Sequence, residues 1–267
     1  MAVRFCSLAS GSDGNSFYVA TDNTHILIDA GLSGKQIEKN LAAVNVQPTQ
    51  IDAIFITHEH SDHIKGAGVM SRRYNIPLYA TGGTWDFIEN SDSIGKVDMR
   101  NRRYVYPEEK CIINDMRIHP FEIPHDASEP VAYSIYACGH KISLATDMGH
   151  ITSTIKENLL DSSAMLLESN HDIELLKNGS YPEYLKRRVL GKNGHLSNHL
   201  AGELLSELMS ERLKYVFLGH LSHENNCPTL AYDTVKDILK SNKILLENSF
   251  AMCIANRSIA SELVELV

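Results

Sequence analysis

The sequence predicts an α/β fold of four layers, αββα, in which two mixed sheets lie face to face with helices outside. Strand-like apolar segments gather in two regions of the chain, and helical segments flank each region. Polar side chains follow the ends of several of these strands. No linker, low-complexity tract or charge block divides the 267 residues, so we expect a single domain over 1–267.

The first half of the chain alternates between strand patterns and helical patterns. Strands are expected at 3–8, 16–20, 25–29, 51–56 and 76–80, and helices at 33–44, 64–74 and 82–90. Ser33 is the expected N-cap of the first helix, because its hydroxyl can accept from a free backbone amide. Segments typical of strands, separated by charged turns, fill 100–122.

The second half begins with a hairpin and continues as alternating strands and helices. Strands at 133–138 and 141–145 are expected to join at Gly139. Further strands are expected at 164–167 and 215–218, and helices at 182–190, 197–210 and 229–240.

Composition indicates a reduced, cytoplasmic protein without a membrane partner. Five cysteines are scattered without CxxC spacing, no run of eighteen apolar residues occurs, and the N-terminus enters a strand pattern without a leader. The formal charge of −8 argues against non-specific adhesion to nucleic acid, although a local basic groove remains compatible with it. Oligomeric state is not predicted.

The run Thr57-His58-Glu59-His60-Ser61-Asp62-His63 follows the apolar strand at 51–56. In an extended loop alternate residues share a face, so His58 and His60 can bind one cation, while Asp62 and His63 point to a second position. Imidazole and carboxylate without thiolate suit Zn²⁺, Mn²⁺ or Fe²⁺. A polar loop that carries histidines by chance is the less favoured interpretation.

Three further strands end in candidate ligands. His125, Asp147 and His220 each follow an apolar segment. Loops at strand ends converge on one edge of a sheet, so we expect these side chains to meet the histidine-rich run. A lone histidine is more often structural, and the recurrence of the pattern is therefore the specific signal.

The order His-x-His-x-Asp-His, His, Asp, His resembles the binuclear metallo-β-lactamase superfamily along nearly the whole chain. The resemblance implies one metal held by His58, His60, His125 and Asp147, and a second held by Asp62, His63, Asp147 and His220, with Asp147 bridging and Asp29 supporting. His220 is preferred to His223 because it directly follows an apolar strand. His25, His119, His140 and His150 are expected to be structural or exposed.

Two segments favour the phosphodiesterase branch of that superfamily. Residues 167–172 and 194–198 resemble segments of ribonuclease Z, whereas Asp147 stands where class B β-lactamases usually carry cysteine. The blocks at 7–12, 29–36, 57–66 and 179–182 resemble the short bacterial YycJ (WalJ) family. Asp13 departs from the family's common serine, and His223-Glu224 from its usual Arg-Asp.

This resemblance implies a DNA 5′-to-3′ exonuclease with a role in DNA repair. A cyclic or nucleotide phosphodiesterase, an RNA-processing nuclease and a non-catalytic metal-stabilised module are the alternatives. DNA is favoured over RNA because the chain has no room for a β-CASP insertion. Two divalent ions, Mn²⁺ or Zn²⁺ with Fe²⁺ possible, would activate a bridging hydroxide to attack phosphorus.

Asp62, His195 and Glu168 are the expected catalytic residues, and the roles of Glu168 and His195 are what the resemblance to ribonuclease Z implies. A carboxylate bonded to an imidazole fixes its tautomer, so Glu168 would prepare His195 to protonate the departing oxygen. The alternative is that Glu168 caps a helix and His195 packs under a turn.

Candidate substrate-binding residues lie in three segments: Ser12, Asn15, Lys186, Arg187, Arg188 and Asn225. The small residues at 10–15 form either a loop whose amides approach an anion or a tight hairpin turn. The basic run at 186–188, with Lys192, either contacts phosphates or forms a solvated helix face. Arg100, Arg102 and Arg103 form a second basic cluster.

Overall fold

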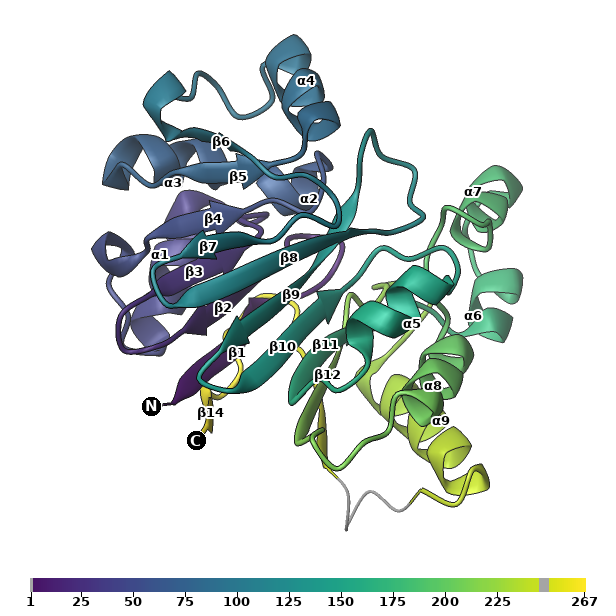
Figure 1. The fold of residues 1–267 in the computed structure, drawn as a ribbon. Coiled ribbons are helices and arrows are strands. Elements are labelled where there is room, and N and C mark those ends of the chain that lie inside the picture. Colours follow the sequence, from purple (N-terminus) through teal and green to yellow (C-terminus); the bar gives the residue numbers. More distant parts are fainter. Residues whose placement is uncertain (1, 245–249) are drawn as a thin grey trace.

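The computed structural model describes residues 2–244 and 250–267 as two seven-stranded sheets that face each other, with helices on both outer faces (Figure 1). The predicted four-layer αββα arrangement is confirmed. Within the described residues, no helix is both long and apolar enough to cross a bilayer.

The first sheet has the strand order β14-β1-β2-β3-β4-β5-β6. Its strands are β1 (Val3–Ala9), β2 (Ser16–Ala20), β3 (His25–Ile28), β4 (Ala53–Phe55), β5 (Leu78–Ala80), β6 (Arg102–Tyr104) and β14 (Val264–Leu266). Pairing is antiparallel from β14 to β3 and parallel from β3 to β6. The carboxyl ends of β3 and β4 therefore lie at one edge.

The second sheet has the order β13-β12-β11-β10-β9-β8-β7. Its strands are β7 (Cys111–Ile113), β8 (Met116–Glu122), β9 (Val131–Ala137), β10 (His140–Ala145), β11 (Ala164–Glu168), β12 (Tyr215–Gly219) and β13 (Ala251–Ile254). The predicted hairpin joins β9 to β10 through Cys138 and Gly139, both at positive φ, as a two-residue turn requires. Strands β10 to β13 are parallel.

Three apolar clusters fill the three interfaces between layers. Strand β12 shows how alternation divides side chains between them, because Phe217 packs between the sheets while Val216 and Leu218 face the helices. Between the sheets, Phe5 packs edge-on against Phe217 with ring centroids 5.8 Å apart. The two-residue period of the sequence thus produces the layer order.

Helices cover both outer faces of the sandwich. On the first sheet they are α1 (Gly34–Ala43), α2 (Ser61–Ile64), α3 (Ala67–Tyr74) and α4 (Gly82–Ser91), with 3₁₀ turns η1 (Pro48–Gln50) and η2 (Met99–Asn101). On the second they are α5 (Ser153–Leu159), α8 (Asn198–Glu207) and α9 (Pro228–Ser241). Two short helices, α6 (Ile173–Asn178) and α7 (Glu183–Val189), lie in the segment between β11 and α8. Ser33 caps α1 as predicted.

The single helix predicted over 64–74 is wrong. Two helices, α2 and α3, occupy this region and meet near Gly66. The break occurs where the chain passes close to Leu32, since a Cβ at Gly66 would lie 2.3 Å from the Leu32 carbonyl oxygen. The first of these helices consequently begins at Ser61, inside the histidine-rich run.

Candidate metal centre and active site

The carboxyl ends of parallel strands from both sheets meet at one edge of the sandwich, where the candidate site residues gather. Asp29 follows β3, Asp147 comes shortly after β10, and His220 follows β12. All three have positive φ, between 55° and 62°. This conformation is uncommon for residues other than glycine, and it turns each chain sharply at the end of its strand.

Three imidazoles form the first group of candidate ligands. Ring centroids of His58, His60 and His125 lie 4.6 to 5.0 Å apart, and each ring offers one nitrogen within 4.8 Å of the others. The motif loop after β4 brings His58 and His60, and the loop after β8 brings His125. This is the trio that the resemblance assigned to one metal.

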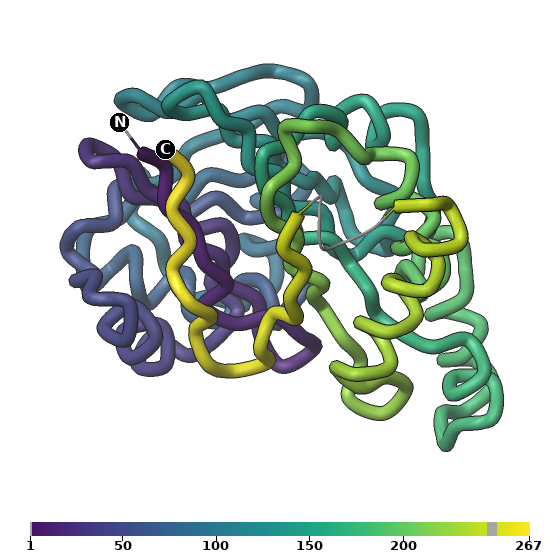
Figure 2. The backbone as a smooth tube through the Cα atoms, turned by 90° about the horizontal axis from the view of Figure 1, so that it is seen from below, coloured from purple at the N-terminus to yellow at the C-terminus, as the bar shows by residue number. Residues whose placement is uncertain are grey.

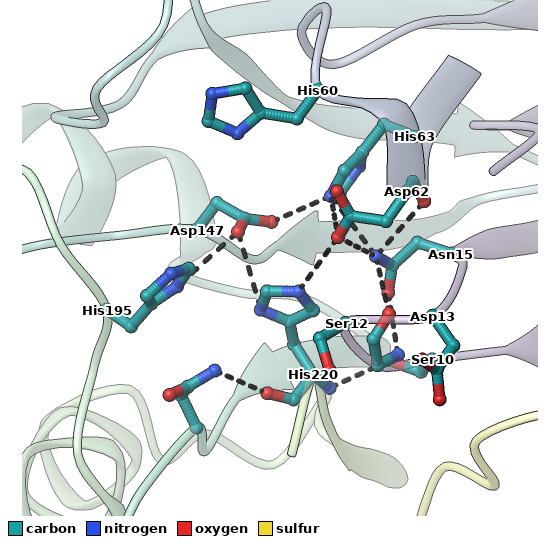
Figure 3. Close-up of polar contacts among 12 residues, drawn as sticks. Ser10, Ser12, Asp13, Asn15, His60, Asp62, His63, Asp147, His195 and His220 are labelled. Atoms are coloured by element: carbon teal, nitrogen blue, oxygen red, sulfur yellow. Dashed lines mark hydrogen bonds and ion pairs between the residues drawn. The ribbon is translucent and has the colours of Figure 1, made fainter. Parts of the chain in front are cut away.

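A second group contains Asp62, His63 and His220. His63 Nε2 lies 3.5 Å and His220 Nε2 3.6 Å from the same Asp62 carboxylate oxygen. Asp62 and His63 lie in the first turn of α2, which directs them away from His60 (Figure 3). A helical turn, rather than an extended loop, thus turns Asp62 and His63 away from His60, but the His63 ring stays beside that of His58, with centroids 4.1 Å apart, and these two imidazoles form a further candidate group with Asp147.

Asp147 lies between the two groups. Its Oδ2 is 3.2 Å from His63 Nε2, and its Oδ1 is 3.4 Å from His220 Nδ1 (Figure 3). The same Oδ1 is 3.7 Å from His125 Nε2. Burial alone would raise the pKa of this carboxyl, but the surrounding imidazoles hold it well below its usual value. Asp147 is thus an anionic oxygen donor within reach of both groups.

Free nitrogens within these groups fit divalent cations. Among the described residues, Nε2 of His58 and Nε2 of His220 are buried without a hydrogen-bond partner. A buried polar atom without a partner is costly, and a cation in each group would satisfy the free nitrogen of that group. Burial also lowers the pKa of His58 well below its ordinary value, which favours the neutral imidazole that binds metal. The donor set suits divalent metals.

Asp29 fixes the orientation of two residues in the motif loop. Its carboxylate accepts from the Thr57 amide at 2.8 Å, the Thr57 hydroxyl at 2.9 Å and His63 Nδ1 at 2.7 Å. A hydrogen bond to one ring nitrogen leaves the other free to bind a metal. Burial raises the pKa of Asp29, and the contact with His63 opposes that rise.

Glu59 points away from the ligand groups and ties two loops together. Its Oε1 accepts from both the amide and the hydroxyl of Ser128, each at 2.7 Å. The loop that carries His58 and His60 is thereby held against the loop that carries His125. This contact helps to bring the three imidazoles into one group.

Glu168 is fully buried at the end of β11 and contacts two imidazoles at once. Its Oε1 lies 2.9 Å from His195 Nδ1 and 3.0 Å from His220 Nδ1, while Oε2 accepts from the amides of Met148 and Leu196. Burial, the largest single influence, raises the pKa of Glu168, but the charge of His195 and the hydrogen bonds from His195 and His220 together lower it to about 2. Carboxylates, Asp147 foremost, likewise overcome burial and raise the pKa of His220 to about 10.

A cavity of about 210 Å³ opens onto these groups. Three of the predicted substrate-binding residues, Ser12, Arg188 and Asn225, line it together with His60, Asp62, Asp147, Asn170, Tyr181, Leu185, Val189, His195, His220 and Ser222. Arg188 also borders a neighbouring groove of about 440 Å³, lined by Asp126, Arg187, Gly191, Lys192 and Asn193. The groove extends the cavity with three basic side chains.

Two predicted substrate-binding residues lie elsewhere. Asn15 is buried beneath the cavity, and its Nδ2 contacts Asp62 Oδ2 at 3.3 Å and His63 Nε2 at 3.1 Å. Lys186 donates to the Lys177 carbonyl and pairs with Glu183. Neither side chain lines the cavity, because hydrogen bonds within the protein hold both.

The loop at 10–15 is the turn of the β1–β2 hairpin. The Gly11 amide donates to Asn15 Oδ1, and the Gly14 amide donates to the Gly11 carbonyl. The Asn15 amide donates to the Asp62 carbonyl. Since these amides have partners within the protein, the hairpin-turn interpretation is favoured over an anion-binding loop. Gly31, after β3, packs against both α2 and this turn, since a Cβ there would lie 1.6 Å from the Asp62 carbonyl oxygen and 2.8 Å from the Asn15 amide nitrogen.

Five further histidines that the sequence analysis considered lie outside the ligand groups. His25 contacts Tyr18, His119 pairs with Glu108, His140 contacts Ser163, His150 contacts the Lys192 carbonyl, and His223 is exposed beside Glu224. In the second basic cluster, Arg100 pairs with Asp98 and Arg102 with Glu89.

Sequence reasoning missed several residues around the cavity. Ser222 and Asn170 line it, although no motif singled them out for this role. Tyr181 also lines the cavity, whereas Tyr184 is 74% exposed. Arg257, from the C-terminal segment, contacts Ser12 at the rim. Of these residues, only Tyr181 could have been found from the sequence, because it lies next to the helix α7 that carries the basic run.

This fold and this donor set define a class of protein. The family model described as a beta-lactamase superfamily domain matches residues 24–217, and the chain belongs to that superfamily. It is therefore a metal-dependent hydrolase. The metallo-beta-lactamase fold protein YhfI from Bacillus subtilis has a similar structure, with a TM-score of 0.74 at 14% identity over 99% of both chains.

Comparison with curated relatives identifies the family within this superfamily. The exodeoxyribonuclease WalJ of Streptococcus pneumoniae serotype 2 is 42% identical over 232 residues, which is 87% of this chain and 86% of the relative. The exodeoxyribonuclease YycJ of Bacillus anthracis is 37% identical over 240 residues, 90% of each chain. The chain belongs to the WalJ/YycJ family, as its sequence motifs predicted.

Proposed function

We propose that this protein is a 5′-to-3′ DNA exonuclease that uses two divalent ions, Mn²⁺ or Zn²⁺, and serves DNA repair. The observation that carries the proposal is the cavity in which two ligand groups share Asp147 and also meet the Glu168–His195 pair. The similarity of the chain to two exodeoxyribonucleases, matched over 86% and 90% of their lengths, supports DNA as the substrate.

In this proposal the ligand groups divide between two ions. One ion is bound by His58, His60, His125 and Asp147, and the other by Asp62, His63, Asp147 and His220. Bound divalent ions polarise a phosphate ester and make water a stronger nucleophile near neutral pH. An oxygen-and-nitrogen donor set is compatible with Mn²⁺, Zn²⁺ or Fe²⁺.

The protein's own residues position the ester and move a proton. Glu168 holds His195 through Nδ1, which leaves Nε2 facing the cavity as the donor to the departing oxygen. Asp62, besides binding metal, keeps a negative charge beside His220. Arg187, Arg188 and Lys192 border the groove beside the cavity, where they would contact backbone phosphates without reading sequence.

One observation favours a second candidate, a phosphodiesterase for cyclic or nucleotide esters. A volume of about 210 Å³ holds a phosphodiester and little more, below the usual range of roughly 300–1,000 Å³ for ligand pockets. The adjoining basic groove argues for a longer chain, because a small ester would not reach it.

The test offers Mn²⁺-loaded protein three substrates: 5′-end-labelled duplex DNA, bis-p-nitrophenyl phosphate and a thioester. Progressive loss of label from DNA supports the exonuclease. Turnover of the small diester alone supports the second candidate, and inactivity on all three would overturn both. Survival of a deletion strain after DNA damage, compared with its complemented parent, tests the role in repair.

A further inference from the structure

Arg257 lies at the rim of the cavity on a segment that crosses from one sheet to the other. The chain leaves β13 in the second sheet and returns to the first sheet as β14, passing beside the β1–β2 loop (Figure 2). The Ser10 amide donates to the Asn256 carbonyl at 2.9 Å, and the Ser261 amide to the Ser7 carbonyl at 2.8 Å. Backbone hydrogen bonds on both sides therefore fix the position of Arg257.

The Arg257 guanidinium bridges two loops that line the cavity. Its Nη1 lies 3.3 Å from Ser12 Oγ and 3.4 Å from Asp13 Oδ2, and its Nη2 donates to the Leu221 carbonyl at 2.9 Å. Ser12 and Ser222, the residue after Leu221, both line the cavity. A fixed cation thus stands one hydrogen bond behind the cavity wall.

The charges around the cavity give this cation a function. The interior carries the carboxylates of Asp62, Asp147 and Glu168, whereas Arg188 supplies a cation to the lining from α7. Arg257 stands beside Ser12, on the side formed by the β1–β2 loop. Its side chain is 28% exposed, and its partner Asp13 is 69% exposed, so a solvent-borne anion can reach this pair. A guanidinium has five N–H donors, more than these contacts use.

We propose that Arg257 binds a phosphate of the nucleic-acid strand next to the phosphate that enters the metal centre, and that Asp13 competes with this phosphate for the guanidinium. The inference rests on the proposed function, because it assumes a strand that extends beyond the cavity. A terminal 5′-phosphate and an internal phosphodiester present the same chemistry to Arg257. The two sources are distinguished by the oligonucleotide's 5′ end.

The test measures binding of a fluorescent, phosphorothioate-linked single strand to the Mn²⁺-loaded protein by anisotropy over a range of salt concentrations. Arg257→Ala and Arg257→Gln should each raise Kd roughly tenfold, as loss of a charge-assisted contact implies. Each should also lower the slope of log Kd against log salt by about 0.7, the share of one phosphate contact in a single strand. Asp13→Asn should lower Kd about two- to threefold.

Arg4→Ala is the matched control. Arg4 Nη2 also donates to a backbone carbonyl, that of Thr21, and pairs with an exposed aspartate, Asp22. Its side chain is 30% exposed, close to the value for Arg257. It lies near the start of β1, at the opposite end of that strand from the loop at 10–15. Kd and salt slope should therefore stay at the wild-type values.

Two patterns support the inference and also identify the phosphate. An effect confined to 5′-phosphorylated strands indicates the terminal phosphate, and an equal effect on 5′-hydroxyl strands indicates an internal one. An unchanged Kd in Arg257→Gln, or a weaker Kd with an unchanged salt slope, would overturn it, as would a wild-type protein that binds no strand. The proposed function is tested separately, by measuring whether the wild-type protein hydrolyses DNA and bis-p-nitrophenyl phosphate.

Discussion

His195 Nδ1 lies 2.9 Å from the carboxylate of Glu168, and this contact sets the orientation of the one imidazole in the cavity that we assign to proton transfer. The same carboxylate oxygen lies 3.0 Å from His220 Nδ1. A residue at the metal centre and a residue proposed for acid catalysis therefore share one buried anion.

The first prediction concerns His195. His195→Ala should lower turnover of bis-p-nitrophenyl phosphate by about 10²- to 10⁴-fold, the usual contribution of a general acid, while the protein keeps both metals. Metal content measured by elemental analysis, alongside steady-state rates, checks this. Loss of either metal in the variant would contradict the role of His195.

The second prediction concerns the ligands. His60→Ala should reduce turnover at least about a hundredfold. Removing a metal ligand should lower activity more than removing a residue that only hydrogen-bonds to a ligand. The thermal unfolding curve should change little, since the His60 side chain lies at the cavity wall rather than in an apolar cluster. His199→Ala, which removes an exposed histidine paired with Glu203, is the control and should retain full activity. Wild-type turnover in His60→Ala would exclude this residue as a ligand.

The positions of the strands, and much of the site, followed from local patterns in the sequence. Alternation in the segment that became β12 predicts one face for each neighbouring layer, and the polar residue after the strand predicts a site at its end. Asp147 and His220 were found in this way, whereas Asp29 was assigned through the family resemblance. The positive φ values of these residues were not predicted, because a backbone turn at a strand end depends on what the loop packs against.

Other features depend on contacts between distant segments and carry no local signal. Arg257 meets Ser12 across 245 positions of sequence, and Glu59 meets Ser128 across 69. The basic run at 186–188 shows a related limit, since a helix directs Lys186 toward the Lys177 carbonyl and Arg188 into the cavity. Spacing alone could not divide the run in this way.

A third prediction concerns Asp29, which holds His63 and Thr57 in place. Asp29→Asn preserves the shape and tolerates the positive φ, but it removes the charge that orients His63 Nδ1. Metal affinity should fall roughly 10- to 100-fold. Competition with a chelator measures that affinity. Asp52→Asn is the control, because Asp52 accepts from the amide of His25, which lies at the opposite end of β3 from Asp29. An unchanged metal affinity in Asp29→Asn would contradict the prediction.

A fourth prediction concerns the fully buried carboxylate of Glu168. Glu168→Gln removes the anion that faces both His195 and His220, so metal-free protein should lose about 3 kcal/mol of its free energy of unfolding. Metal-loaded protein should lose less, because the ions then favour a neutral His220. Urea unfolding with and without metal tests the difference. Equal losses in both forms would show that charge on His220 is not the cause.

A fifth prediction concerns Lys141 on β10, far from the metal centre. Burial lowers its pKa to about 8, with Lys110 acting in the same direction and Asp161 opposing it. An unfolded lysine titrates near 10.4, so between pH 8 and pH 10.4 the unfolded chain binds more protons and stability rises with pH. Below pH 8 the cost of the buried charge is present in full.

Lys141→Met should therefore raise the free energy of unfolding at pH 7, and its advantage should shrink as pH rises from 8 to 10. The gain should be on the order of 1 kcal/mol or less, because the ammonium is partly solvated and donates to the Leu160 carbonyl. Urea midpoints at pH 7, 8, 9 and 10 measure it. Lys214→Met removes an exposed lysine that also donates to a carbonyl, and it controls for the loss of one charge. A difference that stays constant across this pH range would contradict the assignment to Lys141.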